Sequence, residues 1–124
     1  MAYILLADDD APMRGFLTQA LEKAGHEVHS VADGEEALAV LEQDKPCDLL
    51  LADIVMPGMD GIALSQRAMV LRPKLKVMYI TGFAAVAMNH PELTKSGSIA
   101  PPILSKPFHL KDLVAQVDAL LDAA

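Results

Sequence analysis

The chain has 124 residues, 52% of them apolar, and a net charge of −7. This length suits one domain with a real hydrophobic core, and the acidic balance argues against nucleic-acid binding, which calls for a basic surface. The apolar runs are too short to span a membrane, no targeting signal is visible at the N-terminus, and the lone Cys47 excludes an internal disulfide, so we expect a cytoplasmic protein.

Strand-like and helix-like segments alternate along the sequence. Short apolar runs predict strands, and apolar residues repeated at three- and four-residue intervals predict helices. We expect strands at 3–7, 27–31, 49–52, 76–80 and 103–105, and helices at 11–24, 33–43, 60–72 and 110–121.

Two of these helices have a clear apolar stripe. The third helix should bury Leu64, Ala68 and Leu71. The first helix should bury one face made of Met13, Phe16, Leu17, Ala20, Leu21 and Ala24.

The alternation of strand and helix predicts an α/β fold with a parallel sheet and helices on both faces. Right-handed crossovers and the flavodoxin-like strand order 2-1-3-4-5 are the default for such a chain. The exception is the segment 83–102, where Pro91, Gly97 and Pro101 interrupt the pattern. There we expect a short or irregular fourth helix.

Polar residues follow the strands at the points where the strands end. Asp8 and Asp9 follow the first strand, and Asp53 follows the third, which is adjacent in this order. Like charges that close repel, so the carboxylates call for a divalent cation. Thr81 and Lys106 end the fourth and fifth strands and offer donors to a phosphoryl group. Taken one at a time, these residues also fit helix caps and solvated surface.

Together these residues resemble the receiver domain of two-component response regulators, and the resemblance covers residues 1–124. The motifs that carry it are Asp8-Asp9, Asp53 with the following Met56–Gly61 segment, Thr81-Gly82 and Lys106-Pro107-Phe108. It implies a CheY-like fold that accepts a phosphoryl group rather than an enzyme that turns over substrate. Its donor would be a histidine kinase or a histidine phosphotransfer protein.

The resemblance also assigns roles to the site residues. Asp53 would be the phosphoacceptor, and Mg²⁺ would be held by Asp8, Asp9, Asp53 and the backbone carbonyl of Val55. Lys106 would pair with the phosphoryl group, and Thr81 would turn its hydroxyl onto it. Asp10 should cap the first helix instead of joining the metal site.

One residue departs from the usual receiver pattern, and two others bear on the lifetime of the phosphoryl group. Ile103 stands where receivers commonly place Tyr or Phe, so we expect no aromatic switch and expect phosphorylation to act on residues 83–102. Val55 and Phe83 are apolar and cannot orient a water molecule, which predicts slow self-dephosphorylation.

The sequence ends soon after the last helix, so we expect no output domain, and output by protein docking from a monomer or weak dimer. Residues 81–87 and 104–113 resemble single-domain regulators of alphaproteobacteria that, unphosphorylated, act as adaptors for the ClpXP protease. Ala123-Ala124 resembles the tails that such proteases recognise, or simply ends a helix. The four histidines should be surface or cap residues.

Two alternatives stay open. The chain could be a phosphorelay intermediate or phosphate sink, which passes phosphate on without a downstream target. It could also be a phosphatase of the haloacid dehalogenase type, because Asp8 and Asp10 form an acid-x-acid pattern after the first strand. The latter would make Asp8 the nucleophile and would leave Asp53 unexplained.

Overall fold

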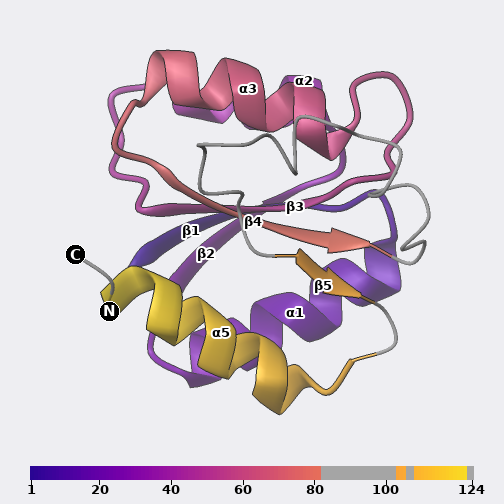
Figure 1. Cartoon of the computed structure of the whole chain (residues 1–124), viewed down its shortest axis with the longest axis vertical. Coiled ribbons are helices and arrows are strands. Elements are labelled where there is room, and N and C mark those ends of the chain that lie inside the picture. Colours follow the sequence, from indigo (N-terminus) through magenta and orange to yellow (C-terminus); the bar gives the residue numbers. More distant parts are fainter. Residues whose placement is uncertain (82–102, 106–107, 123–124) are drawn as a thin grey trace, which may run out of the picture.

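Five parallel strands form one sheet in the order β2-β1-β3-β4-β5 (Figure 1). The computed structural model describes residues 1–81, 103–105 and 108–122. The strands are β1 (Tyr3–Ala7), β2 (Glu27–Val31), β3 (Leu49–Asp53), β4 (Lys76–Thr81) and β5 (Ile103–Ser105). The helices are α1 (Ala11–Lys23), α2 (Gly34–Leu41), α3 (Gly61–Leu71) and α5 (Leu110–Asp122).

This architecture confirms the predicted α/β fold and strand order, and the bounds of the elements agree with the sequence within about two residues. The expected short or irregular fourth helix at 83–102 lies outside the described residues. Within the described ranges, no helix combines the length and the apolar character that a membrane crossing needs.

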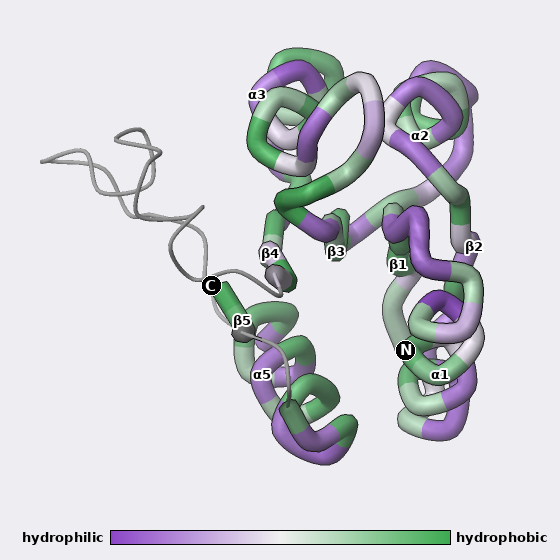
Figure 2. The backbone as a smooth tube through the Cα atoms, turned by 90° about the vertical axis from the view of Figure 1, so that its right-hand side faces the viewer, coloured by the Kyte–Doolittle hydropathy of each residue, from purple (hydrophilic) through white to green (hydrophobic). Residues whose placement is uncertain are grey.

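The sheet separates two hydrophobic cores. Helices α2 and α3 cover one face, and α1 and α5 cover the other (Figure 2). Alternate residues of β3 serve the two cores: Leu50 and Ala52 pack toward α2 and α3, whereas Leu49 and Leu51 pack toward α1 and α5. Burial on both sides is the reason that this strand reads as an uninterrupted apolar run.

Carboxylate caps begin three of the helices. Asp10 accepts from the Met13 N–H at 3.2 Å and Asp60 from the Ala63 N–H at 2.8 Å. Asp33 accepts from the Glu36 N–H at 2.8 Å in the same way. Each cap satisfies a backbone donor that the first helical turn leaves unpaired, so the sequence fixes these helix starts locally.

Three predicted core residues lie at the surface: Phe16, Ala24 and Leu71. Phe16 is 59% exposed and Leu71 is 45% exposed, so the buried stripes of α1 and α3 are narrower than predicted. In α1 the fully buried residues Leu17 and Leu21 are four apart and so lie on the same side of the helix. Phe16 is rotated by about 100° from Leu17 around the helix axis and lies outside the buried side.

His26 corrects a further prediction, because its side chain is not at the surface. Its side chain is only 8% exposed, and its Nε2 lies 2.7 Å from Asp118 Oδ1 on α5. Its Nδ1 accepts from the Ala2 N–H at 3.1 Å, which places the proton of a neutral ring on Nε2. His29 and His109 are exposed as predicted, and His90 lies outside the described residues.

Candidate functional site

Three carboxylates meet at the carboxyl end of the sheet. Asp8 follows β1 and Asp53 ends β3, and the register pairs Ala7 with Ala52 immediately before them. One oxygen from each of Asp8, Asp9 and Asp53 lies within 4.8 Å of the others. Asp8 is fully buried and Asp53 nearly so, while Asp9 is exposed. Three oxygen donors at this spacing fit a hard divalent cation such as Mg²⁺, reached from the exposed side.

Backbone hydrogen bonds hold the two buried carboxylates in place. Asp53 Oδ1 accepts from the Val55 N–H at 3.0 Å. Asp8 Oδ1 accepts from the Asp10 N–H at 2.9 Å, and Arg14 Nη1 donates to the Asp8 carbonyl at 2.8 Å. These bonds hold the two buried acids in fixed orientations, as a preorganised metal site requires.

Gly61 lets helix α3 begin directly against the end of β3. A Cβ at this position would lie 2.2 Å from the Asp53 carbonyl oxygen and 3.0 Å from the Ile54 Cα. The Gly61 N–H also donates to the Ile54 carbonyl at 2.9 Å. Glycine is required here for close approach of two backbones, a role that sequence reasoning missed.

Thr81 is placed beside the acidic group by the sheet. It ends β4 and is fully buried, and Ile80 just before it pairs with Asp53. Val55 lies next to Asp53 as expected, with its side chain 42% exposed; the role of its carbonyl stays a prediction. Lys106 lies outside the described residues, and its pairing also stays a prediction.

Asp10 stays apart from the group of three acids. Its side chain caps α1, as the sequence predicted, and it is not among the carboxylates that could share a metal ion. The Asp10 side chain therefore does not join Asp8 in this group, whereas the Asp53 side chain does. This arrangement favours Asp53, not Asp8 alone, as the centre of the chemistry.

A buried polar pair behind the site was missed by sequence reasoning. Ser65 Oγ on α3 donates to the Ile62 carbonyl at 2.8 Å, so the Tyr79 hydroxyl on β4 is the donor in its hydrogen bond to Ser65 Oγ. In the register, Tyr79 faces Ala52 on one side and Ile103 on the other. The sequence does contain one indication of this pair: Ser65 is a polar residue on the otherwise apolar, buried side of α3.

Comparison with known proteins identifies what this arrangement resembles. The sequence model of the response regulator receiver domain matches residues 4–118. The response regulator receiver protein CpdR of Brucella abortus is 54% identical over 127 aligned residues, which cover 100% of both chains.

Solved structures agree. A CheY-like receiver domain protein from Methanospirillum hungatei is 34% identical, with a TM-score of 0.85 over 98% of this chain and 94% of that one. The response regulator TrrA of Thermotoga maritima, solved in complex with Mg²⁺-BeF, is 26% identical, with a TM-score of 0.82 over 97% of this chain and 99% of that one.

Proposed function

The chain belongs to the response regulator receiver family, and on that premise we propose that Asp53 accepts a phosphoryl group from a histidine kinase or a histidine phosphotransfer protein. The observation that carries the proposal is the placement of Asp53: nearly buried, oriented by the Val55 N–H and grouped with Asp8 and Asp9. We propose that Asp8, Asp9, Asp53 and the Val55 carbonyl hold Mg²⁺, as the Mg²⁺-BeF complex of TrrA supports.

The chemistry follows from these positions. An Asp53 carboxylate oxygen attacks the phosphorus, the bond from phosphorus to the donor's histidine nitrogen breaks, and that nitrogen keeps the electron pair. Mg²⁺, when bound, neutralises negative charge on the phosphoryl oxygens. The hydroxyl of Thr81 and the ammonium of Lys106 would serve the same oxygens. Water later cleaves the aspartyl phosphate, so the chain assists its own phosphorylation and dephosphorylation and acts as a regulator.

We further propose that residues 1–124 act as a cytoplasmic single-domain regulator whose output is docking on a partner protein. Identity of 54% to CpdR over both full chains supports a shared role. The finer proposal is that the unphosphorylated form is an adaptor for the ClpXP protease. Purified ClpX should then bind the unphosphorylated chain and release it when Asp53 is phosphorylated. Transfer of the phosphoryl group to a histidine protein without ClpX binding would instead identify a relay intermediate or sink.

The site assignment is tested by phosphorylation with acetyl phosphate and Mg²⁺, followed by borohydride trapping and peptide mass mapping. The label should fall on Asp53 and be lost in Asp53→Ala. Asp9→Asn should bind Mg²⁺ more weakly and so need more Mg²⁺ to be phosphorylated. The matched variant Asp10→Asn, which can still cap α1, should not. A stable label on Asp53→Ala, or one trapped at Asp8, would contradict the assignment.

A further inference from the structure

The outward side of α3 and the residues after it form an apolar and basic surface. We call this the α3 surface, and its members are Arg67, Met69, Val70, Leu71 and Lys74. Val70 is 82% exposed, more than any other large apolar side chain in the described part of the chain. Arg67, Val70 and Leu71 are spaced three and four apart, so they share one side of the helix. Adjacent exposed apolar side chains are unusual unless they contact something.

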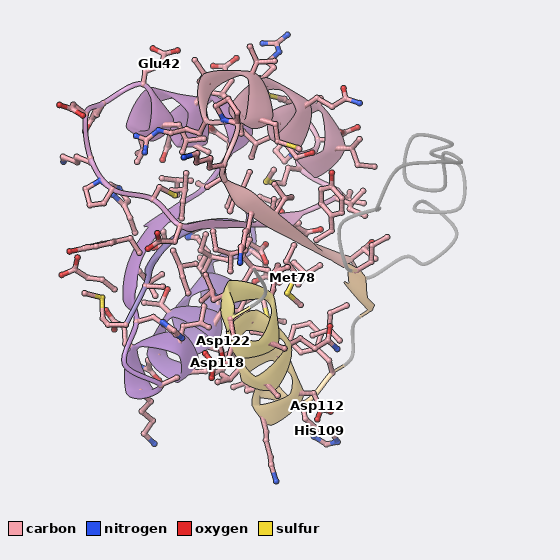
Figure 3. All side chains as sticks on the ribbon, turned by 60° about the vertical axis from the view of Figure 1, so that its left-hand side comes forward. Glu42, Met78, His109, Asp112, Asp118 and Asp122 are labelled. Carbon is pink, nitrogen blue, oxygen red and sulfur yellow. The ribbon has the colours of Figure 1, made fainter. Side chains whose placement is uncertain are left out.

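The charge of the α3 surface is opposite to that of the molecule. The chain carries −7, yet α3 contains no acidic residue between Gly61 and Leu71. Neighbouring α2 exposes Glu35 and Glu36, and Glu42 follows it (Figure 3). The basic strip is therefore local and lies beside an acidic helix.

Two of the cations at this end of α3 are not needed by the fold. Arg72 donates to the Leu41 carbonyl at 3.2 Å and the Gln43 carbonyl at 2.8 Å, and so ties α3 to the end of α2. Arg67 and Lys74 are exposed and form no ion pair within residues 1–81, 103–105 and 108–122. They are thus free to meet an anionic partner.

We propose that the α3 surface binds an amphipathic helix of a partner protein, whose apolar stripe covers Val70 and Leu71 and whose flanking carboxylates meet Arg67 and Lys74. This rests on the proposed docking output and names the surface and the chemistry of the partner. Helices recognised in this way present apolar anchors at three- and four-residue spacing, with charges along the rim that set orientation.

A second copy of the chain fits this surface poorly. Two α3 surfaces face to face would oppose like charges at Arg67 and Lys74. The acidic side of α2 carries no exposed large apolar residue within the described part of the chain. The other exposed apolar pair, Phe16 and Leu110, lies beside Lys23, Lys111 and Glu22 and carries no acidic excess. Neither α2 nor this pair offers an acidic, apolar face, so we take the complementary face to belong to another protein.

Helix α3 is also attached to the strand ends that carry the site. Gly61 joins it to Ile54, one residue after Asp53. Ser65 joins it to Tyr79, two residues before Thr81 on the same strand. A shift of β3 or β4 on phosphorylation therefore passes to α3 through two hydrogen bonds, and the affinity of the α3 surface depends on the state of Asp53.

The test titrates the full chain with a synthetic helical peptide that has a leucine stripe flanked by glutamates. Fluorescence anisotropy gives the affinity, and amide chemical shifts give the location. We expect Val70→Asp to weaken binding at least about tenfold, and Phe16→Asp, a matched exposed apolar position on α1, to leave it unchanged. A peptide with lysines in place of the glutamates should not bind.

Three results would contradict binding at the α3 surface. They are equal peptide affinity for the wild type and Val70→Asp, chemical-shift changes confined to α1 and α5, and equal binding of the lysine peptide. Self-association without the peptide would show that a second copy of the chain is the partner. Stronger binding to vesicles of anionic lipid would show that the partner is a membrane. Beryllofluoride should change peptide affinity in the wild type and less in Tyr79→Phe; an equal change in both would overturn the coupling. Val70→Asp should still be phosphorylated at Asp53. If the wild type is not phosphorylated there, the proposed function is wrong, whatever the result of the peptide titration.

Discussion

The two ends of the sheet differ in how their charged side chains are arranged. At the carboxyl end, Asp8, Asp9 and Asp53 bring oxygens within 4.8 Å of one another, and two of these acids are buried. At the amino end, charged side chains meet partners of opposite polarity: His26 contacts Asp118, and Lys76 donates to the Leu120 carbonyl at 2.7 Å. The first end gathers like charges, which a divalent cation would neutralise, and the second gains stability from satisfied polar groups.

The partners at the amino end come from parts of the chain that are far apart in sequence. Asp48 Oδ2 accepts from the Tyr3 N–H at 2.8 Å, and Asp118 lies 92 residues beyond His26. Figure 3 shows Asp118 and Asp122 toward one end of α5, away from His109 and Asp112. These contacts join β1, the residues before β3, and α5, so this end holds the layers together while the other end carries the site.

The largest expected effect comes from Gly61→Ala at the carboxyl end. The new Cβ would lie 2.2 Å from the Asp53 carbonyl oxygen. Neither a Cβ nor a backbone carbonyl can rotate away as the end of a flexible side chain can. We expect the free energy of unfolding in urea to fall by about 3 kcal/mol or more, with loss of Mg²⁺ binding.

Gly15→Ala is the matched control for this substitution. Gly15 lies inside α1, and an added Cβ there meets nothing within 4 Å. Alanine favours a helix over glycine, so this variant should be more stable by up to about 1 kcal/mol. Equal effects at the two glycines would show that α3 does not need close contact with β3.

A smaller loss is expected from His26→Phe at the amino end. The substitution keeps an aromatic ring, but the buried Ala2 N–H loses its acceptor and Asp118 loses its donor. An unsatisfied buried donor costs about 1–3 kcal/mol, and urea unfolding should report a loss in that range. His29→Phe, at an exposed position on β2 three residues further on, should change stability by less than about 0.5 kcal/mol. Similar losses in both would contradict a stabilising role for the His26 contacts.

The contrast between the ends also explains what the sequence could predict. The carboxyl end was predictable because each acid directly follows an apolar strand, and adjacent strands bring such residues together. Asp8, Asp9 and Asp53 needed only the strand order to be placed. Asp10 was likewise predictable, since a helix cap depends on its immediate neighbours alone.

The amino end was not predictable in the same way. Nothing local to His26 announces Asp118, because their contact depends on how α5 lies across the sheet. The exposure of Phe16 and Leu71 was missed for a related reason: helical periodicity gives the apolar side of a helix but not how wide a stripe the sheet covers. The Ser65–Tyr79 pair required the distance between α3 and β4, which no pattern within either segment contains.

The smallest expected effect has the opposite sign and tests the comparison most directly. Asp53→Asn keeps the shape of the side chain and an oxygen that can accept from the Val55 N–H, but it removes one of three charges that lie within 4.8 Å of one another. In Mg²⁺-free buffer we expect the free energy of unfolding to rise by about 1 kcal/mol, because repulsion between nearly buried carboxylates is relieved. Mg²⁺ should stabilise the wild type by mass action and leave the variant almost unchanged.

Asp48→Asn at the other end is the matched control. It removes a charge from an exposed carboxylate that already accepts from the Tyr3 N–H, and an amide oxygen can replace that acceptor. No gain in stability is expected, because Asp48 is exposed and belongs to no close group of three acids within the described residues. If Asp53→Asn were less stable than the wild type without Mg²⁺, the carboxyl end would owe its stability to the Asp53 charge, and the two ends would not differ in the way that their geometry indicates.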